Sequence, residues 1–129
     1  MNRLTRKIKY AALTAVLFFA PILSAYGHGE AEWIMADPKH LDANSVHCCG
    51  PVDCEKAPLG AITPTKDGLY VELTGQMFPY PSEGPQPSGS YWSIDQEYWW
   101  CWAVPFGSSL IQQGFKPSLR CVFMPSPGV

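Results

Sequence analysis

The segment Glu97-Tyr98-Trp99-Trp100-Cys101-Trp102-Ala103 has the aromatic-rich composition of a β-strand. Side chains alternate between the two faces of a strand. One face therefore carries Trp99, Cys101 and Ala103, and the other carries Tyr98, Trp100 and Trp102. Residues 119–124 alternate in the same way and place Cys121 among core-type neighbours. These two segments predict adjacent strands at the centre of the fold.

The remaining elements are short and are separated by turn residues. Residues 59–65 and 68–74 predict a hairpin, because Asp67-Gly68 is a strong turn signal between them. In its second strand Leu69, Val71 and Leu73 are expected to point the same way. The other expected elements are a helix over residues 28–36, a Pro-rich loop over 79–90, a strand over 91–94 and a helical turn within 107–114. The expected fold is mainly β: a small antiparallel sheet or barrel-like domain with a short N-terminal helix, stapled by disulfides.

The N-terminal region has the pattern of a secretory signal peptide. Four basic residues lie within residues 1–10, a short apolar run covers 11–23, and small residues follow at Ala25 and Gly27. We expect cleavage after Gly27, with cleavage after Ala25 as the alternative. The chain is thus divided into a signal peptide (1–27) and one small β-rich, cysteine-containing domain (28–129), which is periplasmic or secreted.

Charge and hydropathy exclude two classes of partner. Residues 28–129 carry five basic and eleven acidic residues, a net charge of −6, so a basic face for nucleic acid is missing. No apolar run reaches the length of about 18 residues that a membrane-spanning helix needs, so no stable membrane insertion is expected after signal removal.

All five cysteines lie in the exported part, where an oxidising compartment favours disulfides. Five cysteines allow at most two intramolecular bridges. The first choice is a Cys101–Cys121 bridge across adjacent strands, with Cys54 joined to Cys48 or Cys49. A vicinal Cys48–Cys49 bridge is a strained alternative, and a bridge from this cluster to Cys101 or Cys121 is the main competitor.

Three interpretations fit the segment His47-Cys48-Cys49-Gly50-Pro51-Val52-Asp53-Cys54. The first is a Cys-rich turn in which Gly50-Pro51 reverses the chain. The second is a copper or zinc site formed by His47, Cys48, Cys49 and Cys54, with His28 as a further ligand if cleavage makes it N-terminal. The third, a thioredoxin-type redox site, fails because the second cysteine comes two residues too late. The turn is preferred, and no cofactor is expected.

The aromatic residues give the leading functional hypothesis. Tyr98, Trp100 and Trp102, with Tyr91 and Trp92 nearby, could stack a glycan or anchor a cell-envelope protein. The competing interpretation is that the helix bearing Trp33 covers these rings as a second small core. The sequence has no GxSxG, HExxH or phosphate-binding glycine loop, so we expect a non-enzymatic binding domain. The metal-binding protein is the alternative.

Several of these motifs together resemble a group of small, uncharacterised exported bacterial proteins. The resemblance rests on Trp33-Ile34, the Cys48-Cys49 turn with Asp53-Cys54, Trp100-Cys101, and the closing run from Arg120-Cys121 to Pro125. It covers most of residues 28–129, although residues 79–90 and 37–46 depart from the compact pattern of the group. It implies export and a cysteine scaffold, and it carries no activity.

Overall fold

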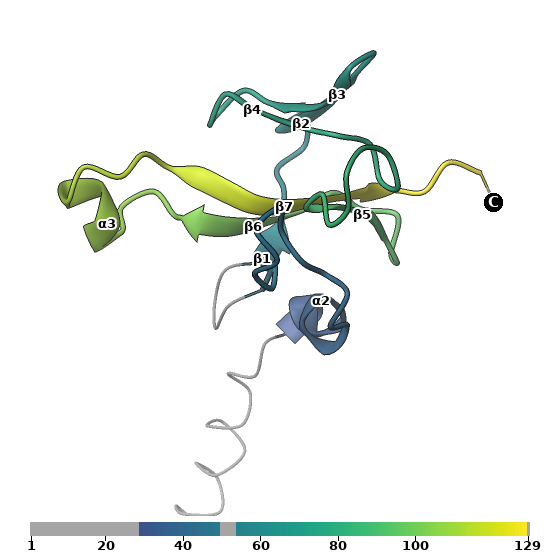
Figure 1. Ribbon diagram of the computed structural model, residues 1–129, viewed down its shortest axis with the longest axis horizontal. Helices are drawn as coiled ribbons and strands as arrows, with labels where there is room; N and C mark the ends of the chain where they lie inside the picture. The colour runs from purple at the N-terminus through teal and green to yellow at the C-terminus, as the bar shows by residue number, and fades with distance from the viewer. Residues whose placement is uncertain (1–28, 50–53, 129) are drawn as a thin grey trace, which may run out of the picture.

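The computed structural model describes residues 29–49 and 54–128 (Figure 1). The predicted signal peptide therefore lies outside the described residues. The elements, in chain order, are η2 (Gly29–Ala31), α2 (Glu32–Ala36), β1 (Cys54–Lys56), β2 (Ile62–Thr65), β3 (Gly68–Val71), β4 (Gln76–Phe78), β5 (Ser90–Ser93), β6 (Trp99–Val104), α3 (Ser109–Gln112) and β7 (Ser118–Pro125). The mainly β prediction is confirmed.

A four-stranded sheet with the order β1-β6-β7-β5 forms the centre of the fold. β1 and β7 both pair with β6 antiparallel, but β5 pairs with β7 parallel, so the expectation of an antiparallel sheet is wrong at this edge. β5 and β6 are joined by a short connection and run in opposite directions. Because β7 lies between them and is antiparallel to β6, it must run parallel to β5.

The predicted hairpin belongs to a second sheet, with the order β2-β3-β4. Its turn requires glycine at position 68, where φ is +140° and a Cβ would lie 2.3 Å from the carbonyl oxygen of Phe78. Leu69 and Val71 are buried as predicted, but β3 ends at Val71 and Leu73 is exposed. β1 and β4, each three residues long, were not predicted.

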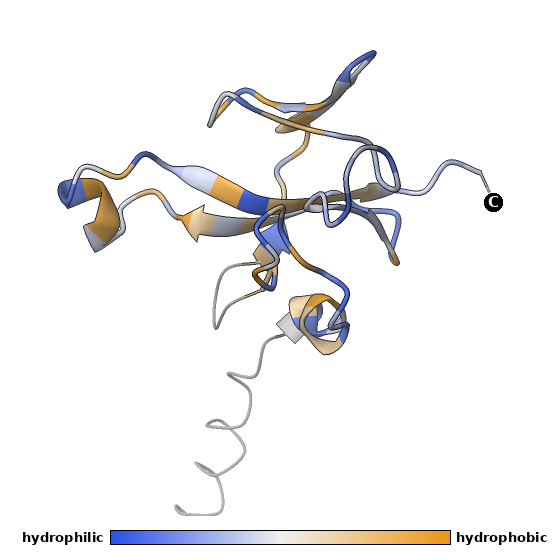
Figure 2. Ribbon diagram, in the orientation of Figure 1, coloured by the Kyte–Doolittle hydropathy of each residue, from blue (hydrophilic) through white to orange (hydrophobic). Residues whose placement is uncertain are grey.

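The two sheets and α2 form three layers, with the four-stranded sheet in the middle (Figure 1). Neither sheet closes on itself in the described part of the chain, so the sheet alternative holds and the barrel-like one does not. Figure 2 shows strongly hydrophobic segments in β7, α2 and α3. Among the described helices, none has the length and apolar character needed to cross a membrane.

Both faces of the central sheet are buried, each in its own hydrophobic cluster. The first cluster packs Trp100, Trp102, Leu119 and Val122 against the three-stranded sheet, through Ile62, Leu69, Val71 and Phe78. The second packs Trp99, Cys101, Cys121 and Phe123 against Ala31, Ile34 and Cys48. The helix bearing Trp33 and Ile34 therefore docks on the body as predicted, on the face that carries Trp99.

Candidate functional site

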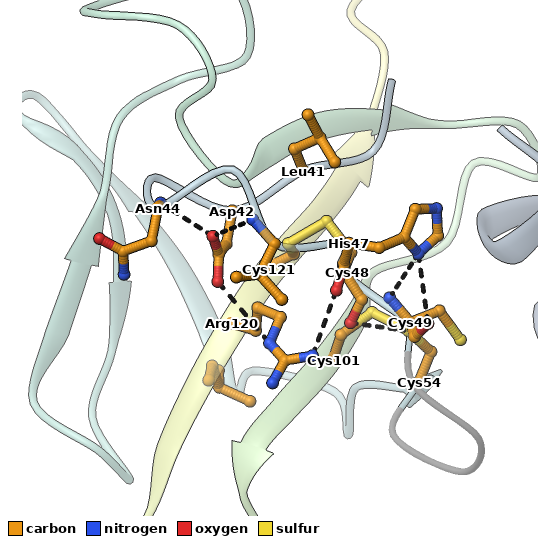
Figure 3. A network of polar contacts seen from close by, with 12 residues as sticks. Leu41, Asp42, Asn44, His47, Cys48, Cys49, Cys54, Cys101, Arg120 and Cys121 are labelled. Carbon is orange, nitrogen blue, oxygen red and sulfur yellow. Dashed lines mark hydrogen bonds and ion pairs between the residues drawn. A yellow bond between two sulfur atoms is a disulfide. The ribbon is translucent and has the colours of Figure 1, made fainter. Parts of the chain in front are cut away.

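The two disulfides are Cys48–Cys121 and Cys54–Cys101 (Figure 3). The preferred Cys101–Cys121 bridge is therefore wrong, and so is the bridge from Cys54 to Cys48 or Cys49. The main competitor, which links the N-terminal cluster to the two core strands, describes the structure. Cys49 belongs to neither bridge. The two disulfides support a non-cytoplasmic, oxidising compartment.

The register of β1 explains the error. Cys101 and Cys121 do lie opposite each other in the β6–β7 ladder, as the alternation predicted. However, β1 pairs with the other edge of β6 and places Cys54 opposite Cys101, with the two Cα atoms 4.0 Å apart. β1 is three residues long, which is too short to show the alternation typical of a strand. Cys54 could therefore not be recognised from the sequence as the partner of Cys101.

A polar network holds the chain before Cys48 against β7 (Figure 3). The Asp42 carboxylate accepts hydrogen bonds from the N–H groups of Asn44 (2.8 Å) and Val46 (2.9 Å). Arg120 forms an ion pair with Asp42 (Nε to Oδ2, 3.6 Å) and donates from Nη1 to the carbonyl of His47 (3.2 Å). These contacts position Cys48 for its bond to Cys121, so the network has a structural role.

His47 is part of the same scaffold. The N–H of Cys49 donates to Nδ1 (3.2 Å), which leaves the proton on Nε2 to donate to the carbonyl of Asp37 (3.0 Å). Cys48 and Cys54 are oxidised, and a metal site at His47, Cys48, Cys49 and Cys54 would need their thiolates. Within residues 29–49 and 54–128, no group of three or more His, Cys, Asp or Glu side chains is placed to hold a metal ion. His28 lies outside the described residues, and the metal alternative stays an untested prediction.

The predicted aromatic surface is not one exposed face. Trp100 and Trp102 are only 3% and 8% exposed, because the three-stranded sheet covers them. Both indole N–H groups donate to the same carboxylate oxygen of Glu55, at 3.0 and 3.1 Å. The competing interpretation, that these rings form a second core, fits their burial, but the covering element is a sheet and not the Trp33 helix.

The other residues of the predicted surface are divided between locations. Tyr98 is half-buried beside Trp100 and Trp102, and Trp92 is exposed. Tyr91 packs on the opposite face, against His40 and Phe123. Its hydroxyl accepts a hydrogen bond from the N–H of Leu41 (2.9 Å) and donates to the carbonyl of the same residue (2.6 Å).

The environment of Tyr91 affects its ionisation. Burial raises the pKa of the Tyr91 hydroxyl above its ordinary value of 10.0, the hydrogen bond from Leu41 partly lowers it, and the charges of Asp37 and Asp42 raise it again. This tyrosine is therefore a neutral structural hydrogen-bonding group at physiological pH.

A groove that sequence reasoning missed lies at the edge of the seam between the two sheets. It has a volume of about 590 Å³ and is lined by Pro58, Leu59, Gly60, Ala61, Glu72, Leu73 and Trp100. Leu59 is fully exposed, and Leu73 is 55% exposed. The signal available in the sequence was a leucine flanked by turn residues, in Pro58-Leu59-Gly60, where a solvated polar residue is the usual choice. We call this the Trp100 groove.

Internal contacts engage several of the polar side chains that line a second cavity of about 320 Å³. It is lined in part by Asp42, Gln76 and Arg120. Asp42 and Arg120 belong to the network that positions Cys48. The Gln76 amide donates to the carbonyl of Leu119 (3.0 Å) and accepts from its N–H (2.7 Å). This cavity is therefore a weaker candidate for a binding site than the Trp100 groove.

No protein family, curated protein or solved structure matches this chain.

Proposed function

We propose that this chain is an exported, non-catalytic domain that binds a protein partner, and that the partner places an apolar segment in the Trp100 groove. The observation that carries the proposal is that two exposed leucines, Leu59 and Leu73, line one groove together with the buried Trp100. The groove exposes apolar and polar surface in nearly equal parts, and its apolar part can accept a partner side chain.

The groove is held in place by contacts within the domain, which suits a binding role. The indole of Trp100 is fixed by the hydrogen bond to Glu55 and by the core cluster around it. A preorganised floor reduces the conformational entropy that binding costs. The leucines above it are already ordered on a turn and at the end of β3, so apolar area is buried without refolding of the domain.

Charge favours a partner segment that also carries a basic residue. Glu72 lines the groove, and Glu55 is bonded to the indole at its floor. Residues 28–129 carry a net charge of −6, which adds a long-range attraction for basic partners.

The same geometry favours a protein over a glycan. Sugar rings stack on the open face of an aromatic side chain, but Trp100 is only 3% exposed, and its groove is walled by aliphatic side chains. Aliphatic walls suit a leucine- or valine-like side chain of a partner. Export is supported by the signal-type N-terminal region and by the two disulfides.

The test uses a defined probe, a library of displayed random peptides selected on the purified oxidised protein. We expect enrichment of peptides that combine an aliphatic residue with Lys or Arg. Leu73→Lys should reduce binding of these peptides at least about tenfold, because it places a charge where an apolar side chain must be buried.

Ile94→Lys is the matched control, because Ile94 is a similarly exposed aliphatic residue outside the groove. Selected peptides should bind this variant as they bind the wild type. Equal loss in both variants, or no loss in either, would contradict the groove as the site. Binding on a glycan array without any peptide enrichment would contradict a protein partner.

A further inference from the structure

The two disulfides differ in how well a reductant can approach them. Of the four bridged cysteines, three are 0% exposed: Cys48, Cys101 and Cys121. Cys54, at the start of the edge strand β1, is partly exposed. A thiolate reduces a disulfide by attacking one of its sulfur atoms, so access to a cysteine decides which bridge opens first. The Cys54–Cys101 bridge is the more accessible of the two.

This bridge holds a short strand in place. β1 has three residues, lies at the edge of the central sheet, and leaves Glu55 and Lys56 exposed. The ion pair of Lys56 with Glu30 (Nζ to Oε2, 3.6 Å) is also exposed and adds little. An edge strand of this length has low local stability. The covalent bond to β6 therefore supplies much of the attachment of β1.

β1 leads directly into the Trp100 groove. Ala57 follows β1, and its N–H donates to the carbonyl of Tyr98 (2.9 Å). The next residues, 58–61, all line the groove. Within β1, Glu55 lies opposite Trp100 and accepts the hydrogen bond of its indole N–H (3.0 Å). Release of β1 would therefore displace residues that line the groove and remove the group that fixes Trp100.

The rest of the fold does not depend on this strand. β6, β7 and β5 remain paired if β1 leaves, because β1 is the edge of the order β1-β6-β7-β5. The second bridge joins Cys48 to Cys121 on β7, and neither cysteine is among the described residues that line the groove. The groove can thus be lost while the central strands stay in place.

We propose that the Cys54–Cys101 disulfide is a redox switch for the Trp100 groove. The oxidised form holds the groove, and reduction by a dithiol releases β1 and lowers the affinity for the partner. This inference rests on the proposed function of the groove.

The reduction is a two-electron exchange with a dithiol reductant. One of its thiolates attacks the sulfur of Cys54, the S–S bond breaks, and Cys101 leaves as a thiolate. The second thiolate of the reductant attacks the mixed disulfide and releases Cys54. The reductant becomes a disulfide, and its two protons end on Cys54 and Cys101.

Redox buffers of reduced and oxidised dithiothreitol test the proposal on the purified wild type, with thiols trapped by alkylation and located by peptide mapping. We expect Cys54 and Cys101 to be alkylated at a lower proportion of reduced dithiothreitol than Cys48 and Cys121. The form with only this bridge reduced should bind the peptides selected on the oxidised protein about tenfold more weakly. Because coupling is reciprocal, saturating peptide should raise the dithiothreitol ratio at the midpoint of reduction by the same factor.

A second measurement needs no peptide. The indole N–H signals of Trp100 and Trp102 should shift in NMR spectra when the first bridge opens, because Glu55 is the acceptor of both, while the dispersed signals of the folded domain remain. Cys49→Ser is the matched control, since Cys49 belongs to neither bridge, and it should follow the wild type in every measurement.

Four results would overturn the switch. They are opening of Cys48–Cys121 first, global unfolding on the first reduction, unchanged indole signals, and a trapped peptide that links Cys49 to Cys54 or Cys101. Equal peptide affinity in the oxidised and reduced forms would overturn it too and leave the proposed function standing. Failure to select any peptide would contradict the proposed function, and the indole signals would still decide whether reduction releases β1.

Discussion

Two indole N–H groups converge on one oxygen of Glu55, and this residue links β1 to the centre of the core. Sequence alternation predicted that Trp100 and Trp102 share a face, and this is confirmed by their common cluster. It could not predict the acceptor, because Glu55 lies more than forty residues earlier on a strand of three residues. A long-range hydrogen bond leaves no periodic signal in the sequence.

Glu55→Ala should lower the free energy of unfolding by about 1–3 kcal/mol, since two nearly buried indoles lose their acceptor. Glu55→Gln keeps an acceptor oxygen and should retain most of the stability. Urea unfolding followed by tryptophan fluorescence measures both. Glu97→Ala, an exposed carboxylate on the same chain, is the control. Equal stability of Glu55→Ala and the wild type would contradict the role of this carboxylate.

Tyr91 gives the domain a specific response to alkaline pH. Because the pKa of its hydroxyl is raised in the folded state, the folded chain holds this proton more tightly than the unfolded chain does. The stabilisation is complete below about pH 10 and decreases as the pH rises through the folded pKa. Tyr91→Phe should reduce this alkaline loss of stability.

The same variant should be less stable at about pH 8, by about 1–2 kcal/mol, because both backbone groups of Leu41 lose their partner. Urea unfolding at about pH 8 and about pH 10.5 measures both effects. An unchanged difference between the two pH values in Tyr91→Phe would show that other groups cause the alkaline response.

At the scale of elements, one side chain joins the two sheets. Gln76 on β4 hydrogen-bonds with both the N–H and the carbonyl of Leu119 on β7, at a point where the β6–β7 ladder is irregular. A primary amide can replace a strand partner there because it carries both a donor and an acceptor.

Gln76→Glu should destabilise the domain by about 1–2 kcal/mol, because a carboxylate accepts from the N–H of Leu119 but cannot donate to its carbonyl. Gln76→Ala should cost at least as much. Thermal unfolding measures both, with Gln112→Ala on the exposed surface of α3 as the control. If Gln76→Glu unfolds at the wild-type temperature, the amide does not join the sheets.

The elements that could be predicted are those with a strong local pattern. The hairpin around Asp67-Gly68, the aromatic strand β6 and the closing strand β7 are all present. β1 and β4 were missed because three residues cannot show a period, and their existence depends on pairing with β6 and β3. The parallel placement of β5 is a property of the topology, which no local pattern encodes.

At the scale of the whole molecule, the disulfides tie Cys48 and β1 to the two central strands. Each bridge joins residues that are far apart in the chain, with sequence separations of 73 and 47. In the chain-entropy account, each closes a loop large enough to stabilise the fold by about 4 kcal/mol.

The double variant Cys54→Ser, Cys101→Ser should therefore lose about 4 kcal/mol of unfolding free energy and keep the Cys48–Cys121 bridge. Peptide mapping under non-reducing conditions measures the bridges directly in the wild type. A Cys101–Cys121 peptide in the oxidised wild type would contradict the structure.

The partner surface could not be predicted because alternation shows which side chains share a face and not what covers that face. Both faces of β6 are buried, one by a sheet and the other by α2, so the aromatic residues became core. The exposed leucines of the Trp100 groove lie on a turn and just beyond a strand, where sequence patterns are weakest. The proposed binding site thus depends on where the strands end and the loops begin.

The most direct test of the proposed function is a titration followed by NMR of the indole N–H groups, with a peptide selected on the wild type. We expect the Trp100 indole signal to shift progressively with added peptide, because this residue lines the groove. The indole signal of Trp33, on the opposite face of the central sheet, should stay unchanged. A bound peptide that leaves Trp100 unperturbed and shifts the exposed Trp92 instead would contradict the account.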